Sequence, residues 1–193
     1  MDQTLAVWIL VILSLATASL PFVVERPFVA LPWVQAGGAA RPSWLRWIES
    51  LLFFAILAVL VYWTPRWIGA AFFSASDLAS VSVFLLKVGA IVAAAVLLLA
   101  YAGWRNKGRA VVKSFFDRLI EVLVLYVLVG TLGLGLEANI GNPFVQRWEF
   151  YAITLSLFVV LAYPGFVYRY LLKHPKAKKV APSSSSSSSS SAS

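Results

Sequence analysis

Five apolar runs, each long enough to cross a membrane, constrain this chain more than any other feature. A transmembrane helix needs about 20 predominantly apolar residues to cross about 30 Å of hydrocarbon. Runs of that size, bounded by charged residues, Pro or Gly, cover residues 4–24, 44–64, 78–104, 116–136 and 148–172. Of the whole chain, 61% is hydrophobic and only 12% is charged, and the mean hydropathy is +0.84. We therefore expect residues 1–174 to form an all-α membrane domain of five transmembrane helices, because a water-soluble core of this size would leave much apolar surface uncovered.

The residues around these runs predict how the helices end and connect. Pro65 is expected to stop the second helix, and Pro164 is expected to kink the fifth. The apolar segments 27–35 and 67–73 are too short to span, so we expect them to lie on or dip into the interface. Residues 175–193 are basic and then almost all serine, which predicts a disordered tail. Aromatic residues typical of membrane interfaces lie near the span ends: Trp44, Trp47, Tyr62, Trp63, Trp67, Tyr101, Trp104, Trp148, Tyr151, Tyr168 and Tyr170.

The distribution of positive charge predicts the orientation in the membrane. Lys and Arg near span ends prefer the cytoplasmic side. With five spans, thirteen of the 16 lysines and arginines fall on the side that holds the first and third connections and the C-terminal tail. Only Arg66, Lys87 and Arg147 fall on the other side. We expect the N-terminus outside and the C-terminus in the cytoplasm, and this topology accounts for the net charge of +8 without a nucleic-acid partner.

Several kinds of chemistry lack their residues in this sequence. There is no cysteine, which excludes disulfides, Fe–S clusters and thiolate zinc sites. The single histidine, His174, lies in the basic tail, so neither a haem nor a histidine-rich metal centre is expected. No phosphate-binding glycine loop, nucleophile elbow or carboxylate pair deep within a span is present. The sequence therefore predicts no catalytic, cofactor-binding or metal-binding residues and no enzyme activity.

Two Arg-x-x-Glu pairs lie at the cytoplasmic ends of the second and fourth spans. They are Arg46 with Glu49 and Arg118 with Glu121, and the segments around them look like a degenerate parallel repeat. Ionisable groups within spans are candidates for function by default. Each pair could anchor a partner or form part of a proton path, or its two members could simply neutralise each other at the interface.

Three further charged residues are candidates at the outer side. Lys87 lies one or two turns inside the third span, where it could serve transport or extend its stem to the interface. Glu137 and Glu149 flank the short fourth connection and are expected to face each other. They could load protons or could simply end their helices in solvent. We expect these residues, together with the two pairs, to be contact or functional positions.

Charged and aromatic marks along about half of the chain resemble a known family. They are Glu25-Arg26-Pro27-Phe28, Leu119-Ile120-Glu121, Glu137, Trp148-Glu149-Phe150-Tyr151 and Pro164-Gly165-Phe166-Val167. The sequence resembles small, uncharacterised bacterial inner-membrane proteins whose genes commonly lie at the end of the operon for the NADH:quinone oxidoreductase, respiratory complex I. Members are typically about three helices long, so residues 36–112 look like an insertion of two helices. An even number of added helices preserves the orientation of the rest.

The resemblance implies an accessory, assembly or stabilising protein of respiratory complex I, in contact with lipid and with subunits of that complex. A small oligomeric transporter or a proton-conducting subunit, built on the second and fourth helices, is the alternative. Discontinuous helices that meet at the membrane midplane would favour that alternative. An enzyme acting on lipid is a more distant possibility, because the sequence has no base and nucleophile in a plausible array.

Overall fold

Helices make up every secondary-structure element in the part of the chain that the structure describes. This computed structural model describes residues 3–35, 42–70, 78–106, 111–140 and 146–172. The expected tail, 175–193, and His174 lie outside these ranges. The elements are α1 (Gln3–Val23), α2 (Ser43–Gly69), α3 (Leu78–Arg105), α4 (Phe115–Ile140), α5 (Trp148–Leu161), α6 (Tyr163–Val167) and a π-helical turn, η1 (Tyr168–Leu172).

Four of these helical segments are long and apolar enough to cross a membrane. They are α2, α3, residues Phe115–Asn139 of α4, and the continuous stretch Trp148–Leu172 that comprises α5, α6 and η1. A fifth segment, Val7–Val23 within α1, is apolar but shorter. The expectation of an all-α membrane protein is confirmed to this extent, and the composition is that of a multi-pass protein.

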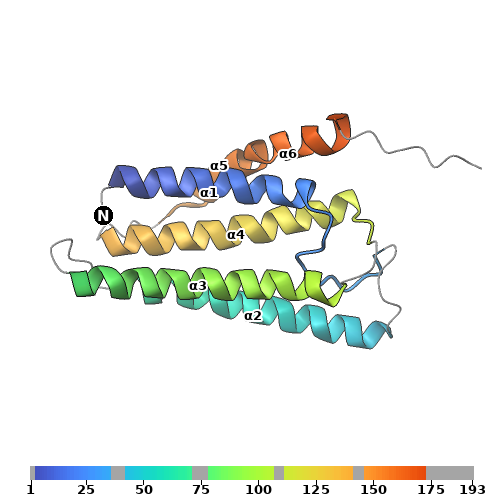
Figure 1. Cartoon of the computed structure of the whole chain (residues 1–193), viewed down its shortest axis with the longest axis horizontal. Coiled ribbons are helices and arrows are strands. Elements are labelled where there is room, and N and C mark those ends of the chain that lie inside the picture. The colour runs from blue at the N-terminus through green and yellow to red at the C-terminus, as the bar shows by residue number, and fades with distance from the viewer. Residues whose placement is uncertain (1–2, 36–41, 71–77, 107–110, 141–145, 173–193) are drawn as a thin grey trace, which may run out of the picture.

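Helix α4 forms the centre of the bundle. Figure 1 shows consecutive long helices running in opposite directions, with α4 between α1 and the pair α2 and α3. The most extensive helix–helix contacts are those of α4 with α2 and with α1, while α5 and α6 pack mainly against α1. Half of the apolar stretch of α4 is buried, against 6% of that of α3. The bundle therefore has one central helix and leaves most of α3 uncovered.

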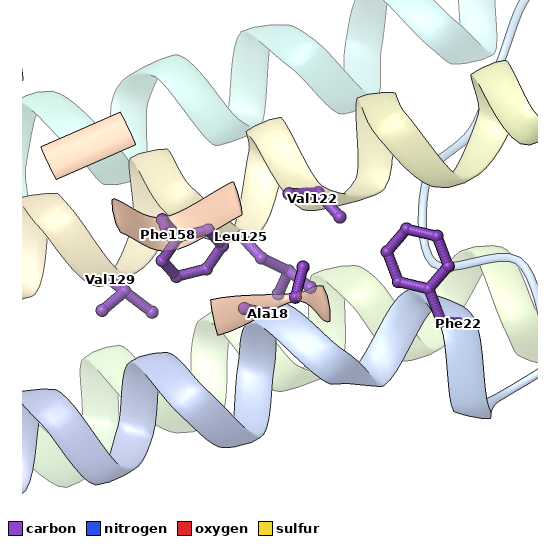
Figure 2. Close-up of a cluster of buried hydrophobic side chains, with 7 residues drawn as sticks. Ala18, Phe22, Val122, Leu125, Val129 and Phe158 are labelled. Carbon is purple, nitrogen blue, oxygen red and sulfur yellow. The ribbon is translucent and has the colours of Figure 1, made fainter. Parts of the chain in front are cut away.

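Three apolar clusters join the helices to α4. In the first, Ala18 and Phe22 of α1 meet α4 and Phe158 of α5 (Figure 2). In the second, Ile68 of α2 packs with Phe84 of α3 and with α4. The third joins α2 and α4 through the segment that follows α1. The α4 residues in these clusters are Val122, Val124, Leu125, Val129, Leu132 and Leu136. Their spacing of one to four residues places an apolar surface on several sides of the helix, as a central helix requires.

The expectation that Pro65 ends the second helix is wrong. Helix α2 continues through Pro65 to Gly69. Proline removes one backbone donor but leaves the rest of the turn intact, and transmembrane helices tolerate it where neighbours supply packing. Here Ile68 is completely buried against Phe84, and its carbonyl oxygen accepts a hydrogen bond of 3.0 Å from Asn139 Nδ2. Tertiary contacts of the last turn thus favour the helix over the break.

The fifth apolar run is interrupted, as Pro164 predicts. Helix α5 ends at Leu161, and Pro164 occupies the first turn of α6. At Gly165 a Cβ atom would lie 2.7 Å from the backbone oxygen of Ser19. The break therefore brings the backbone of α6 into direct contact with that of α1.

The connection between α1 and α2 is not a surface loop. Its described part, residues 24–35, has no helix, and in Figure 1 it runs from the end of α1 past the end of α4. Val29 is 2% exposed and packs with Phe53, Leu57 and Val124. Irregular backbone near membrane depth is tolerated when protein covers it. We call residues 24–35 the inserted connection, because Val29 inserts between the helices of the bundle. The name does not refer to the insertion of two helices expected at residues 36–112.

Candidate functional site

Four charged side chains are buried together at the N-terminal end of α4. Lys113 precedes the helix, and Asp117, Arg118 and Glu121 lie in its first two turns. Their exposed fractions are 6%, 2%, 2% and 0%, respectively. Charged residues are almost never buried this far unless they have partners. We call these four residues the α4 charge cluster.

Glu121 links this cluster to the inserted connection. Its Oε1 accepts a hydrogen bond of 2.8 Å from the backbone N–H of Phe28. Its Oε2 lies 2.6 Å from Lys113 Nζ, in an ion pair whose side chains are both fully buried. Lys113 also donates to the carbonyl oxygen of Val24 at 3.1 Å, and its Nζ lies 4.6 Å from the centre of the Phe28 ring. A carboxylate and an ammonium thus hold both ends of the segment 24–28.

Asp117 binds the far part of the inserted connection. Its Oδ1 accepts a hydrogen bond of 2.8 Å from the indole Nε1 of Trp33. Its Oδ2 accepts from Gln35 Nε2 at 3.3 Å and from the backbone N–H of Ser114 at 3.0 Å. The carboxylate also lies in the first turn of α4, where the helix dipole favours a negative charge.

Arg118 closes the end of α1. Its Nη1 donates to the carbonyl oxygens of Pro21 at 2.7 Å and Phe22 at 3.4 Å. The last carbonyls of a helix lack helical partners and carry the negative end of the dipole, so a buried guanidinium suits this position. Its Nε has no hydrogen-bond partner among the described residues.

The electrostatics of the cluster favour a fixed assembly. Burial lowers the pKa of the Lys113 ammonium, and the neighbouring Glu121 carboxylate opposes that shift. Two carboxylates and two cations balance in formal charge. All four side chains bind groups of the protein itself, so the arrangement acts as a clamp that holds the inserted connection and the end of α1 against α4.

Two further ion pairs lie near the same end of the bundle. Glu25 of the inserted connection pairs with Arg169 of η1, and Glu49 of α2 pairs with Arg105 of α3. The Glu25 side chain is about half exposed, whereas those of Glu49 and Arg105 are largely covered. These pairs join elements far apart in the sequence. Together with the contact between Arg118 of α4 and the end of α1, they give each of the helices α1 to α4 a charged contact at this end.

At the second of the Arg-x-x-Glu motifs, the structure gives Arg118 and Glu121 hydrogen-bond partners other than each other. Arg118 bonds to α1 carbonyls and Glu121 bonds to Lys113 and Phe28, because these backbone groups are buried and need partners. Arg46 Nη2 donates to Ser43 Oγ at 3.4 Å, within its own helical turn.

The outer candidates lie apart from the α4 charge cluster. Lys87 is half-buried on α3. Glu137 is half-buried near the end of α4, and both of its carboxylate oxygens accept hydrogen bonds of 3.1 Å from Gln146 Nε2. Glu149 is exposed in the first turn of α5, and no hydrogen bond within the described ranges joins it to Glu137.

Sequence reasoning missed Lys113, Asp117 and Trp33 as members of the site. Lys113 entered the sequence analysis only through the count of positive charges, and Asp117 and Trp33 were not singled out. The available signal was their spacing: residues 113, 117 and 121 follow at intervals of four, which places them on one side of a helix start. Their partners in the inserted connection had no comparable signal.

The comparison with protein families identifies the family. The model of a protein family of unknown function, DUF2818, matches two stretches, residues 6–96 and 82–173. Together these stretches cover most of the chain. The chain belongs to DUF2818.

Each matched stretch contains most or all of three long helices, and α3 contributes to both. The inserted connection lies in the first DUF2818 match and the α4 charge cluster in the second. Searches of curated proteins and of solved structures found no match.

Proposed function

We propose that this protein crosses the bacterial inner membrane five times, with its N-terminus outside and its C-terminus in the cytoplasm. The alternating directions of α1 to α5 support this topology. Among the described basic residues, those at the end of the bundle that holds the α4 charge cluster outnumber those at the opposite end. The first group comprises Arg26, Arg46, Arg105, Lys113, Arg118 and Arg169, and the second Arg66, Lys87 and Arg147. The positive-inside rule then assigns the first end to the cytoplasm.

Its proposed role is to support a larger membrane assembly by helix packing, without catalysis of its own. The observation that carries this proposal is the exposed surface of α3, of whose apolar stretch only 6% is buried. Leu86 and Leu97, on that helix, are more than two-thirds exposed. In addition, the charged groups of the α4 cluster bind the protein's own backbone. An internally braced bundle with a free apolar helix is suited to packing against neighbouring transmembrane helices.

We further propose that the assembly is the respiratory NADH:quinone oxidoreductase. This step rests on the resemblance to proteins encoded beside its operon. Under the same proposal, α2 and α3 are the two helices added to a three-helix ancestor. Because α2 packs extensively on α4, the addition would be part of the core of the bundle.

Co-purification from native membranes tests this function. The tagged full-length chain is extracted in mild detergent and the bound proteins are identified, with the same tag on an unrelated inner-membrane protein as control. We expect subunits of the NADH:quinone oxidoreductase with this chain and not with the control, and less assembled complex when the gene is deleted. Absence of those subunits, together with unchanged assembly and activity in the deletion strain, would contradict the proposal.

A small transporter or proton-conducting subunit is the second candidate. The break between α5 and α6 favours it, because transporters often use interrupted helices at their binding sites. Lys87→Gln separates the two candidates, since Lys87 lies outside the α4 charge cluster and its loss should leave the clamp intact. A conductive role predicts that this change abolishes proton flux in reconstituted vesicles at normal protein levels. The accessory role predicts no flux in either form.

A further inference from the structure

A cleft lies between α1, α4 and α5, away from the α4 charge cluster. Its volume is about 410 Å³, and its walls are largely apolar. Val129 and Phe158, which lie together in Figure 2, contribute to its lining. Gly130 and Gly133 remove side chains from the α4 wall, and a Cβ added at Gly130 would meet nothing within 4 Å. Gly130 therefore leaves the space beside α4 open, whereas a Cβ at Gly133 would contact Leu10 Cδ1 at 3.4 Å.

The length of the cleft corresponds to one leaflet of a bilayer. Along α4 it extends from Tyr126, near the middle of the helix, to Glu137, close to its end. Eleven residues of helix rise about 16 Å, and half of a hydrocarbon core of about 30 Å is about 15 Å. In a bundle that spans the membrane, the Tyr126 end would lie near the midplane and the Glu137 end at the headgroups. Such a space fits one acyl chain of a lipid in that leaflet.

The polar groups of the cleft indicate which headgroup it would accept. At the deep end, Thr154 Oγ1 donates to the carbonyl of Phe150 at 2.8 Å. The Tyr126 hydroxyl lies 3.0 Å from the carbonyl of Tyr151 and 2.8 Å from Thr154 Oγ1. The hydroxyl protons of Tyr126 and Thr154 are thus used within the protein.

At the other end, Glu137 is the one charged residue among the described residues that line the cleft. It accepts hydrogen bonds from Gln146, and carboxylate oxygens can accept more than one such bond each. A half-buried carboxylate at headgroup depth attracts a cationic donor. Arg147, exposed and next to Gln146 in the chain, lies at the same end and could face the phosphate of a zwitterionic lipid.

We propose that the cleft binds an aminophospholipid, with one acyl chain along Gly130 and its primary ammonium on Glu137. Phosphatidylethanolamine has this chemistry. Phosphatidylcholine has the charge without N–H donors, and phosphatidylglycerol lacks the cation. The inference depends on α4 lying in a bilayer and is independent of any association with respiratory complex I.

Photo-crosslinking in nanodiscs tests the site. The full chain is reconstituted in phosphatidylcholine nanodiscs that contain a small, equal fraction of one of three probes. The probes carry the same photoreactive acyl chain on ethanolamine, choline or glycerol headgroups. We expect the ethanolamine probe to label peptides that contain residues 126–137 roughly two- to five-fold more than the others, the range of a partly exposed ion pair.

Two variant pairs separate chain binding from headgroup recognition. Gly130→Phe fills the cleft and should abolish labelling of this region by every probe. Gly89→Phe on α3, where a Cβ also meets nothing within 4 Å, should leave it unchanged. Glu137→Gln keeps the shape and removes the charge, so it should retain labelling and lose the preference for ethanolamine. Glu149→Gln, at the exposed start of α5, should keep that preference.

Equal labelling by the three probes, or preference for the glycerol headgroup, would overturn the proposal. So would labelling that persists in Gly130→Phe. The protein extracted from native membranes can also be labelled without prior removal of bound molecules. If a bound protein or a small molecule other than an aminophospholipid then blocks labelling, the cleft has a different occupant. Because Glu137→Gln alters no packed apolar side chain, its result remains informative even where Gly130→Phe fails to fold.

Discussion

At the scale of single residues, the most important group is the buried carboxylate of Glu121. It has no exposed surface, and it binds both the ammonium of Lys113 and the N–H of Phe28. Removing one member of a buried pair leaves an uncompensated charge, which is far more costly than the net value of the intact pair. The α4 charge cluster should therefore fail when one member is truncated.

Glu121→Ala tests this expectation. It should lower the free energy of unfolding by about 3–5 kcal/mol, the cost of leaving a buried partner unpaired. Denaturation in detergent, followed by circular dichroism, measures the change. Glu25→Ala is the matched control, because Glu25 also pairs with a cation but is about half exposed, and its loss should cost under about 1 kcal/mol. Equal effects of the two substitutions would show that the cluster does not brace the fold.

Residue-level prediction from the sequence reached only part of this site. Arg118 and Glu121 could be singled out, because charges inside an apolar run are costly. Most of their partners could not, since apart from Lys113 they are backbone groups more than 90 residues earlier in the chain. Local spacing favours pairing at i and i+3, but the unsatisfied groups of the inserted connection and of the α1 terminus outweigh it.

At the scale of elements, the inserted connection is held by contacts at both of its ends. Glu121 and Lys113 bind residues 24–28, and Asp117 binds Trp33 and Gln35. Between these points Val29 is packed in the core, while Val34 is 64% exposed. Loss of the Asp117 contacts should therefore loosen the connection without unfolding the bundle.

Single-cysteine labelling measures this loosening, since the natural chain has no cysteine. Val29→Cys should react slowly with a maleimide, and adding Asp117→Ala should raise its rate roughly 10- to 100-fold, as expected for a lost charged hydrogen bond of about 1.5–3 kcal/mol. Val34→Cys should react quickly in both backgrounds. A labelling rate at position 29 that does not depend on Asp117 would contradict the role of this carboxylate.

Another prediction concerns the contact between α6 and α1. Gly165→Ala would place a Cβ against the backbone of Ser19, which cannot rotate away, so the variant should lose about 1–3 kcal/mol of stability. Gly89→Ala on α3 is the control and should be neutral or stabilising by up to about 1 kcal/mol, because alanine favours a helix. Thermal unfolding of both variants in detergent provides the comparison. Equal melting temperatures would contradict close packing of α6 on α1.

The bounds of the helices could be predicted where the length of the apolar run determines them, and less well where packing against other helices determines them. The apolar runs give α1, α3 and α4 within a few residues, since the hydrocarbon thickness sets their length. The fifth run coincides with the whole stretch Trp148–Leu172, which the structure divides into α5, α6 and η1. The end of α2 was misjudged, because local chemistry at Pro65 competes with the burial of Ile68 three residues later. A single sequence does not reveal that contact.

At the scale of the whole molecule, α4 organises the bundle and its charge cluster braces one end. The arrangement leaves α3 largely uncovered and places the lipid-sized cleft at the opposite half of α4. The proposed role as a packing partner and the proposed lipid site both require that these helices span a bilayer. Five crossings, with the two termini on opposite sides, are therefore the central claim.

Compartment-specific reporters at the two termini test this claim most directly. One reporter is active only outside the cytoplasm and the other only inside it, and each is fused in turn to either end of the full chain. We predict that the outside reporter works only at the N-terminus and the cytoplasmic reporter only at the C-terminus. Activity of the same reporter at both ends would mean an even number of crossings and would contradict the account.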